Sequence, residues 1–371
     1  MSLRKSGHVV LFGLVTFTLL VVRVSHAQLP ETIDDKEFWR LVTDMSEAGG
    51  TFPQQFMSNE DSAQFVIPSL KQATRPGGVY IGVGSEQNFT YIAAVRPRLA
   101  FIVDIRRDNV FEHLMYKALF ELSENRADFI SRLFARKRPD GLNAGMGVKT
   151  LFDAFRPIEV DASVYEANVR AVMDRLTKDH GFPLTDADRA AVIKTLDAFR
   201  TAGPYSLKGF GDTTNPTYAE LMSATDLAGS LQSYLASEEN FRVVRELEQK
   251  NLILPIVGDF AGDKALVAIG RYVRERGAIV NTFYVSNVER YLFEQGERRR
   301  QFYSNVSSLP ADASSNFVRA VTSDISRRLD IPIPDQPTKW RTFLFGMQDS
   351  VRGVTDGRVQ NYAQLFEVGR R

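Results

Sequence analysis

The chain has 371 residues, enough for one large domain or two of ordinary size, and its 44% hydrophobic and 25% charged residues are typical of a globular protein. It contains no cysteine, which excludes disulfides, a thiol nucleophile and a thiolate metal site. The 46 basic and 45 acidic residues almost cancel, so no excess of charge points to a nucleic acid partner.

Residues 1–27 have the three parts of a secretory signal peptide: a basic start, an apolar run at residues 9–22, and small residues before a cleavage point after Ala27. The apolar run of about 14 residues is shorter than the roughly 20 residues that a membrane span needs. Removing this segment leaves 43 basic against 45 acidic residues. The sequence therefore predicts an exported protein, periplasmic or secreted, with no membrane span after cleavage. An uncleaved leader that anchors the protein and a misassigned start codon are the alternatives.

Residues 78–108 are the most informative stretch of the chain. The β-forming run at 79–81 leads into a glycine turn at 82–84, a helical pattern that ends at Pro97, and a second apolar run at 99–103. This order predicts strand, turn, helix and strand, and the last strand ends on an acid. A unit of this kind can bind an adenosine-containing ligand.

Several side chains of this unit are candidates for contact with such a ligand. Gly82 and Gly84 let the backbone approach the ligand, and Asp104 at the strand end can accept both hydroxyls of a ribose. Further candidates follow the two strands: Ser85, Asn88 and Arg106. The alternatives are structural: Ser85 caps the helix, and Asp104 pairs with Arg106. Gln87 stands where a nicotinamide or flavin fingerprint has glycine, which disfavours those two cofactors.

The middle of the chain is mainly helical in pattern. Residues 139–160 contain glycines and the turn pair Pro139-Asp140 and are expected to form a loop. Thr185 and Asp188 have the spacing of a capping box. Helical periodicity is present over residues 108–138, 162–176, 185–200, 217–227 and 238–250.

A second strand–helix–strand unit follows at residues 252–285, and residues 340–345 are expected to form a further strand at a sheet edge. Alternation of strands and helices predicts an α/β fold with a doubly wound, mostly parallel sheet. Residues 28–371 are then a single domain, with a large helical insertion at about 125–250.

The ends of the second pair of strands supply candidates for substrate contact. Asp259 could hold a polar group and Phe260 could stack on a flat ring, with Tyr284 and Asn287 as further candidates. Ser286 and Glu289 also have capping-box spacing, which we take as the explanation of that pair.

Without the leader only two histidines remain, His113 and His180. A histidine-rich metal centre is therefore excluded, and no metal ligand is assigned. We interpret His113 as a packing or surface residue and His180 as part of a helix end, and neither as catalytic.

The runs GVGSEQNFTYIAA, FIVDIRR and FYVSNVERYL resemble an uncharacterised bacterial family with the fold of class I S-adenosylmethionine-dependent methyltransferases. The resemblance implies S-adenosylmethionine as cofactor, with Gly82 and Gly84 at its amino-acid end and Asp104 on its ribose. It places Asp259-Phe260 after the fourth strand, where many relatives carry an Asn/Asp-Pro-Pro-aromatic motif whose prolines are missing here. It also implies that the cover at residues 52–56 contacts the ligand.

Methyl transfer requires mainly that the acceptor lies in line with an already activated methyl group. The first expectation is thus a methyltransferase of unknown acceptor. The leader favours a second one, because S-adenosylmethionine is made in the cytoplasm: an exported, non-catalytic Rossmann-like protein that binds another small molecule or a protein partner. A nicotinamide-dependent oxidoreductase is the third, and Gln87 disfavours it.

Overall fold

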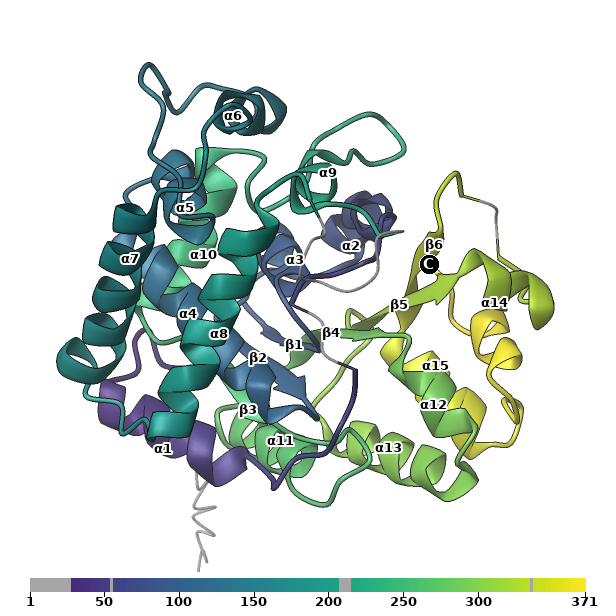
Figure 1. Cartoon of the computed structure of the whole chain (residues 1–371). Helices are drawn as coiled ribbons and strands as arrows, with labels where there is room; N and C mark the ends of the chain where they lie inside the picture. Colours follow the sequence, from purple (N-terminus) through teal and green to yellow (C-terminus); the bar gives the residue numbers. More distant parts are fainter. Residues whose placement is uncertain (1–27, 54–55, 207–214, 334–335) are drawn as a thin grey trace, which may run out of the picture.

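The computed structural model describes residues 28–53, 56–206, 215–333 and 336–371, and within these ranges the chain folds around a six-stranded sheet (Figure 1). The strands are β1 (Val79–Gly82), β2 (Leu99–Asp104), β3 (Ile253–Val257), β4 (Val280–Ser286), β5 (Asn316–Thr322) and β6 (Trp340–Gly346). Their order across the sheet is β3-β2-β1-β4-β5-β6, with β1 to β5 parallel and β6 antiparallel to β5. The predicted α/β class with a mostly parallel sheet is confirmed.

The strand order reverses at β1. The chain runs outward from β1 through β2 to β3, and then returns to place β4 on the other side of β1. The connections on the two sides of this point leave a crevice at the carboxyl ends of the strands, where open α/β sheets bind their ligands.

Three helices precede or lie within the first strand pair, together with a 3₁₀ turn. They are α1 (Asp35–Met45), the 3₁₀ turn Ala63–Val66, α2 (Ile67–Ala73) and α3 (Gln87–Val95). The connection from β2 to β3 is helical over much of its described length, and most of its helices lie on the side away from β5 and β6 (Figure 1). They are α4 (Arg107–Leu122), α5 (Arg126–Leu133), α6 (Val148–Phe155), α7 (Ala162–Asp174), a π-helical turn Arg175–Asp179, α8 (Asp186–Ala202), α9 (Tyr218–Ser223) and α10 (Glu238–Gln249).

The last part of the chain alternates helices with β4, β5 and β6. Its helices are α11 (Ala265–Glu275), α12 (Val288–Phe293), α13 (Gly296–Ser308), α14 (Ser323–Arg328), α15 (Met347–Thr355) and a 3₁₀ turn at Ala363–Glu367.

Neighbouring residues of β4 show that helices cover both faces of the sheet. The ring of Phe283 lies 6.3 Å from that of Phe302 on α13. The next ring along the strand, Tyr284, lies 4.9 Å from Tyr91 on α3. Successive side chains of a strand point to opposite faces, so α13 and α3 lie on opposite sides of the sheet. Every residue of β1, β2 and β3 is buried, as expected of parallel strands covered on both faces.

The five strands expected from the sequence are confirmed, including the edge position of residues 340–345, as is the capping box at Thr185. Other expectations were wrong. The helical run at 108–138 is broken after Leu122, where Asn125 caps a new helix, and α6 occupies part of the expected loop at 139–160. The strand β5 and the helix α13 were missed.

The sheet order also corrects the position of Asp259-Phe260. These residues follow β3, which pairs with β2 at the edge of the sheet, and not the fourth strand. The fourth strand in chain order lies beside β1, ends at Ser286 and is followed by Asn287. A placement after the fourth strand would require a third strand before residue 252, and the described residues between β2 and β3 form helices and loops instead.

Candidate functional site

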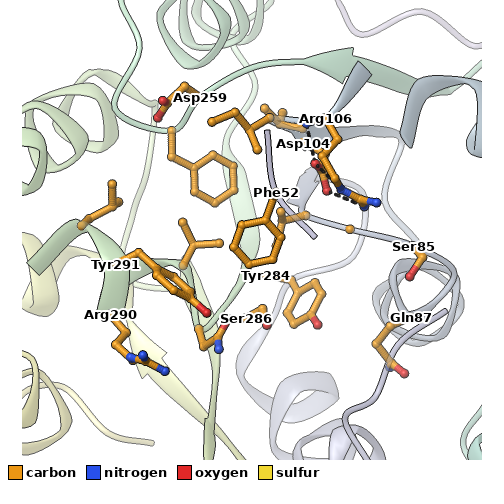
Figure 2. A pocket seen from close by; sticks show the side chains of 18 of the residues that line it. Phe52, Ser85, Gln87, Asp104, Arg106, Asp259, Tyr284, Ser286, Arg290 and Tyr291 are labelled. Carbon is orange, nitrogen blue, oxygen red and sulfur yellow. Dashed lines mark hydrogen bonds and ion pairs between the residues drawn. The ribbon is translucent and has the colours of Figure 1, made fainter. Parts of the chain in front are cut away.

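A cavity of about 520 Å³ opens at the carboxyl ends of β1 to β4 and reaches the end of β5 and the start of β6 (Figure 2). This volume is in the range of about 300–1,000 Å³ that is common for small-molecule sites. Its walls include the residues that follow β1 to β4, a loop before β1, and the helix α12. The lining residues discussed below are Phe52, Glu60, Gly84, Ser85, Gln87, Asp104, Arg106, Asp259, Phe260, Tyr284, Ser286, Asn287, Arg290, Tyr291, Arg298 and Trp340.

The glycine turn after β1 is built around the buried side chain of Asn88. Its amide nitrogen donates to the carbonyls of Val83, Gly84 and Ser85, and its amide oxygen accepts from the hydroxyl of Tyr80 at 2.8 Å. A Cβ on Gly82 would lie 1.9 Å from the Asn88 Oδ1 atom, which explains the glycine. Gly82 and Asn88 do not line the cavity, so they shape the turn from behind.

Gly84 is the residue of this turn that faces open space. It has a φ of +81°, and no atom lies within 4 Å of where a Cβ would be. Its carbonyl accepts from the amide of Asn109 at 2.9 Å and the Nε2 atom of His113 at 2.8 Å. Burial lowers the pKa of His113 to about 4, so the imidazole is neutral at pH 7 and serves to hold this turn.

The alternative in which Ser85 caps the helix was wrong, because α3 begins at Gln87 and its N-cap is Glu86, without a side-chain cap. Ser85 and Gln87 instead line the cavity, and Figure 2 shows both at its β1 side. Gln87 is only 4% exposed, and its side-chain nitrogen has no hydrogen-bond partner among the described residues.

Asp104 at the end of β2 is paired with Arg106 in the cavity wall, and both side chains are buried (Figure 2). Its Oδ1 atom accepts from the Arg106 backbone nitrogen at 2.8 Å and from Nε at 3.2 Å, and Oδ2 accepts from Nη2 at 3.2 Å. A carboxylate offers about four lone-pair sites. The pairing of Asp104 with Arg106, given above as the structural alternative, is thus present, and it leaves room for one further donor without movement of Arg106.

The end of β3 supplies a second carboxylate–guanidinium pair. Asp259 accepts from the backbone nitrogen of Ala261 at 2.9 Å and forms an ion pair with Arg298 of α13. The ring of Phe260 is stacked on Phe302 with centroids 5.8 Å apart, so the apolar core already occupies one of its faces.

Ser286, at the end of β4, has a strained backbone and a hydrogen-bond partner that the sequence did not predict. Ser286 has a φ of +50°, a left-handed conformation that is uncommon for residues other than glycine. Its hydroxyl donates to the Oε1 atom of Glu60. The predicted capping box with Glu289 was wrong: α12 has no side-chain cap, and Glu289 instead pairs with Arg319.

Glu60 was missed by the sequence analysis, although it is the most deeply buried acid in the cavity wall. It is 2% exposed, and its Oε2 atom has no hydrogen-bond partner among the described residues. Burial raises the pKa of Glu60 to about 7, against the opposing effect of the Ser286 and Tyr284 hydroxyls. Its sequence context, an acidic loop at residues 58–61, gave no periodic pattern or motif that could have found it.

Two aromatic rings close the cavity on the side of α12. Phe52 and Tyr291 lie edge to face with centroids 5.6 Å apart, and Arg290 lies beside them (Figure 2). Phe52 belongs to the 52–56 stretch expected to contact ligand, of which residues 54–55 lie outside the described residues. Arg290 and Trp340 also line the cavity and were not expected there.

The cavity thus brings together eight of the ten residues expected at the site: Gly84, Ser85, Asp104, Arg106, Asp259, Phe260, Tyr284 and Asn287. The other two, Gly82 and Asn88, support the turn. In the described ranges no group of three or more His, Cys, Asp or Glu residues is placed to hold a metal ion. No helix in those ranges has the length and apolar character to cross a bilayer. The expected signal peptide at residues 1–27 lies outside the described residues.

Comparison with protein families gives a match over residues 55–365 to a domain of unknown function, DUF7790. The chain belongs to the DUF7790 family. The matched region includes the whole sheet and all the strand ends that form the cavity. Among curated proteins, none matches the chain.

Proposed function

We propose that this DUF7790 protein binds S-adenosylmethionine in the cavity and transfers its methyl group to a small acceptor that remains to be identified. One observation carries the proposal: a glycine turn after β1 and an acid at the end of β2 line the same cavity. This cavity lies where the strand order reverses, which is where open α/β sheets bind ligands. The strand order and the antiparallel β6 are compatible with a Rossmann-like methyltransferase fold.

The residues fit the cofactor in part. The open space at Gly84 accommodates the amino-acid end, and Asp104 keeps one acceptor site for a ribose hydroxyl. When bound, the cofactor supplies a methyl group on a sulfonium, which needs little activation by the protein. The protein then has to position the acceptor and receive its proton.

The pairing of Asp104 with Arg106 favours a second candidate. A carboxylate that already accepts three hydrogen bonds is less available to a ribose, and residues 1–27 predict export to a compartment without S-adenosylmethionine. The alternative is therefore an exported, non-catalytic protein that binds another small molecule, or a protein partner, at the same strand ends.

Calorimetric titration of residues 28–371 with S-adenosylmethionine and S-adenosylhomocysteine tests the first candidate. We expect saturable one-site binding of both compounds. In a separate assay with labelled S-adenosylmethionine, we expect transfer of the methyl group to a component of a cell extract. Absence of binding by both compounds would overturn it. Native mass spectrometry of the protein purified from its own host tests the alternative, because it reports a co-purified ligand of a different class.

A further inference from the structure

Glu60 is a buried acid to which the proposed cofactor contacts, at the glycine turn and at Asp104, assign no role. It lines the cavity, and its Oε2 atom has no hydrogen-bond partner within the described ranges. A buried polar atom without a partner is unfavourable, and more so if it is charged, so such an atom in a cavity wall points to a ligand group that satisfies it.

The loop that carries Glu60 is fixed at both ends. On one side the backbone nitrogen of Ser58 donates to both oxygens of Glu86, at 3.1 and 3.0 Å. On the other side Asp61 accepts from the backbone nitrogens of Lys339 and Trp340 at 2.8 and 2.9 Å. Hydrogen bonds of this kind hold a functional side chain in one position before a ligand arrives.

The partner of Glu60 on the sheet is also held in an unusual geometry. Ser286 adopts its positive φ at the last residue of β4, and this conformation is unfavourable for a residue other than glycine. Its hydroxyl engages the Oε1 atom of Glu60, which leaves Oε2 for another group. Ser286 ends β4, the strand that pairs with β1 and so borders the glycine turn's strand.

We infer that Glu60, positioned by Ser286, binds an O–H or N–H group of the methyl acceptor and takes its proton, an inference that rests on the proposed function. In this step the O–H or N–H bond breaks and the proton goes to Oε2. The freed electron pair of the heteroatom forms the bond to the methyl carbon, whose bond to sulfur breaks with its electrons left on sulfur. Glu60 is ionised before the step and protonated after it.

The acidity of Glu60 suits this role, because an effective general base has a pKa near the working pH. Burial raises the pKa of Glu60 to about 7, and the neighbouring charge of Asp61 acts in the same direction. The hydrogen bond from the Ser286 hydroxyl and the nearby hydroxyl of Tyr284 oppose the rise. The aromatic rings of Phe52, Tyr284 and Tyr291 in the same wall favour an acceptor with an apolar or aromatic body.

Labelling with dicyclohexylcarbodiimide tests the inference on residues 28–371 without cofactor, because this reagent is apolar and reacts with protonated carboxyl groups. We expect Glu60 to be labelled, with a rate that falls about fivefold between pH 7 and pH 8 as the carboxyl ionises. Glu86 is an internal control: burial also raises its pKa to about 7, but it does not line the cavity. Labelling of Glu86 as fast as Glu60, or no labelling of Glu60, would overturn the inference.

Two variants and three probes sharpen the test. Ser286→Ala removes a hydrogen bond that stabilises the ionised form of Glu60, so labelling of Glu60 should persist to higher pH. Glu60→Gln should abolish the label on the proteolytic peptide that contains residue 60. Benzyl alcohol and benzylamine should slow labelling, and toluene, which has no donor, should not. A response to only one of the two donors identifies the acceptor class; equal protection by all three contradicts the inference. S-adenosylhomocysteine binding without labelling of Glu60 would leave the proposed function standing and remove only this step.

Discussion

Glu289 on α12 and Arg319 on β5 form an ion pair that is almost completely buried, with each side chain about 1% exposed. Nε and Nη2 of Arg319 lie 2.6 and 3.0 Å from the two carboxylate oxygens. The hydroxyl of Tyr303 on α13 donates to the same carboxylate. Because α12 also carries Arg290 and Tyr291, this pair joins one wall of the cavity to the sheet.

Removal of one partner of this pair should destabilise the whole fold. Glu289→Ala leaves the Arg319 charge buried without its carboxylate, and we expect a loss of about 3–5 kcal/mol in the free energy of unfolding, measured by urea denaturation. The matched control is Glu297→Ala on α13, whose side chain is 91% exposed and whose pairing with Arg300 spans 3.8 Å. The control should change the free energy by less than about 1 kcal/mol. A loss below 1 kcal/mol for Glu289→Ala would contradict the assignment.

The pairing of Asp104 with Arg106 makes a prediction about cofactor affinity. Asp104→Ala should weaken the binding of S-adenosylhomocysteine at least tenfold, since a hydrogen bond to a charged group contributes about 1.5–3 kcal/mol. Arg106→Ala should not weaken it and should strengthen it by up to about tenfold, because the acceptor sites of Asp104 become free. Isothermal titration calorimetry measures both.

The control for these variants is Asp324→Ala, an acid on α14 whose side chain is 90% exposed and which does not line the cavity. The affinity of this variant for S-adenosylhomocysteine should equal that of the unmodified protein. If Asp104→Ala binds S-adenosylhomocysteine as tightly as the control does, Asp104 does not bind the ribose hydroxyls. Such a result would support the non-catalytic alternative.

The sequence predicted the part of the site that local patterns encode. A glycine turn followed by an acid-terminated strand is a contiguous signal, and the cavity does contain Gly84, Ser85 and Asp104. The sequence did not predict Glu60, because its role depends on contact with Ser286, which lies 226 positions further along the chain. The capping-box spacing of Ser286 was misleading for the same reason, since the long-range hydrogen bond overrides the local motif.

The order of the strands in the sheet also could not be predicted from local sequence patterns. Asp259 was assigned to the wrong strand because hydrophobic runs give the existence of strands and not their neighbours in the sheet. The strand β5 was missed although most of its residues are buried, because Asn316, Arg319 and Thr322 interrupt the apolar pattern. The ion pair of Arg319 with Glu289 explains how a charged residue occupies a buried strand.

A pH dependence of stability should arise at His180, which lies between Asp35 and Glu121 with ring nitrogen to carboxylate distances of 2.6 and 2.7 Å. Burial alone lowers the pKa of His180, but the two carboxylates outweigh it and the pKa is raised above 6.5. The folded state therefore binds the proton more tightly than the unfolded state. This contribution is fully present below about pH 6.5 and is lost as the pH rises through the higher folded pKa.

The measurement is the difference in the free energy of unfolding between the unmodified protein and His180→Gln across pH 5 to 9. The difference cancels the effect of the other buried acids, including Glu60, Glu86 and Glu248, whose pKa values are also raised. We expect the advantage of His180 to be largest at the acidic end and to shrink above neutral pH. An advantage that is constant with pH would show that the ring is neutral and only packs there.

Two neighbouring glycines should separate stability from ligand binding. Gly82→Ala places a Cβ 1.9 Å from the Asn88 amide oxygen and 2.7 Å from the Tyr80 hydroxyl, so the hydrogen bonds that build the turn must break. We expect a loss of about 2–3 kcal/mol in the free energy of unfolding. Gly84→Ala meets no atom within 4 Å, and its cost is the strain of a positive φ, about 1 kcal/mol.

The ligand measurement should give the opposite ranking. The new methyl group of Gly84→Ala extends into the space where the glycine turn faces the cavity, so this variant should stay folded and lose S-adenosylhomocysteine binding at least tenfold. Thermal unfolding and calorimetric titration of the two variants, side by side, give both quantities. A Gly84→Ala variant that binds normally would show that no ligand backbone contact is made at this turn, whatever the stability of Gly82→Ala.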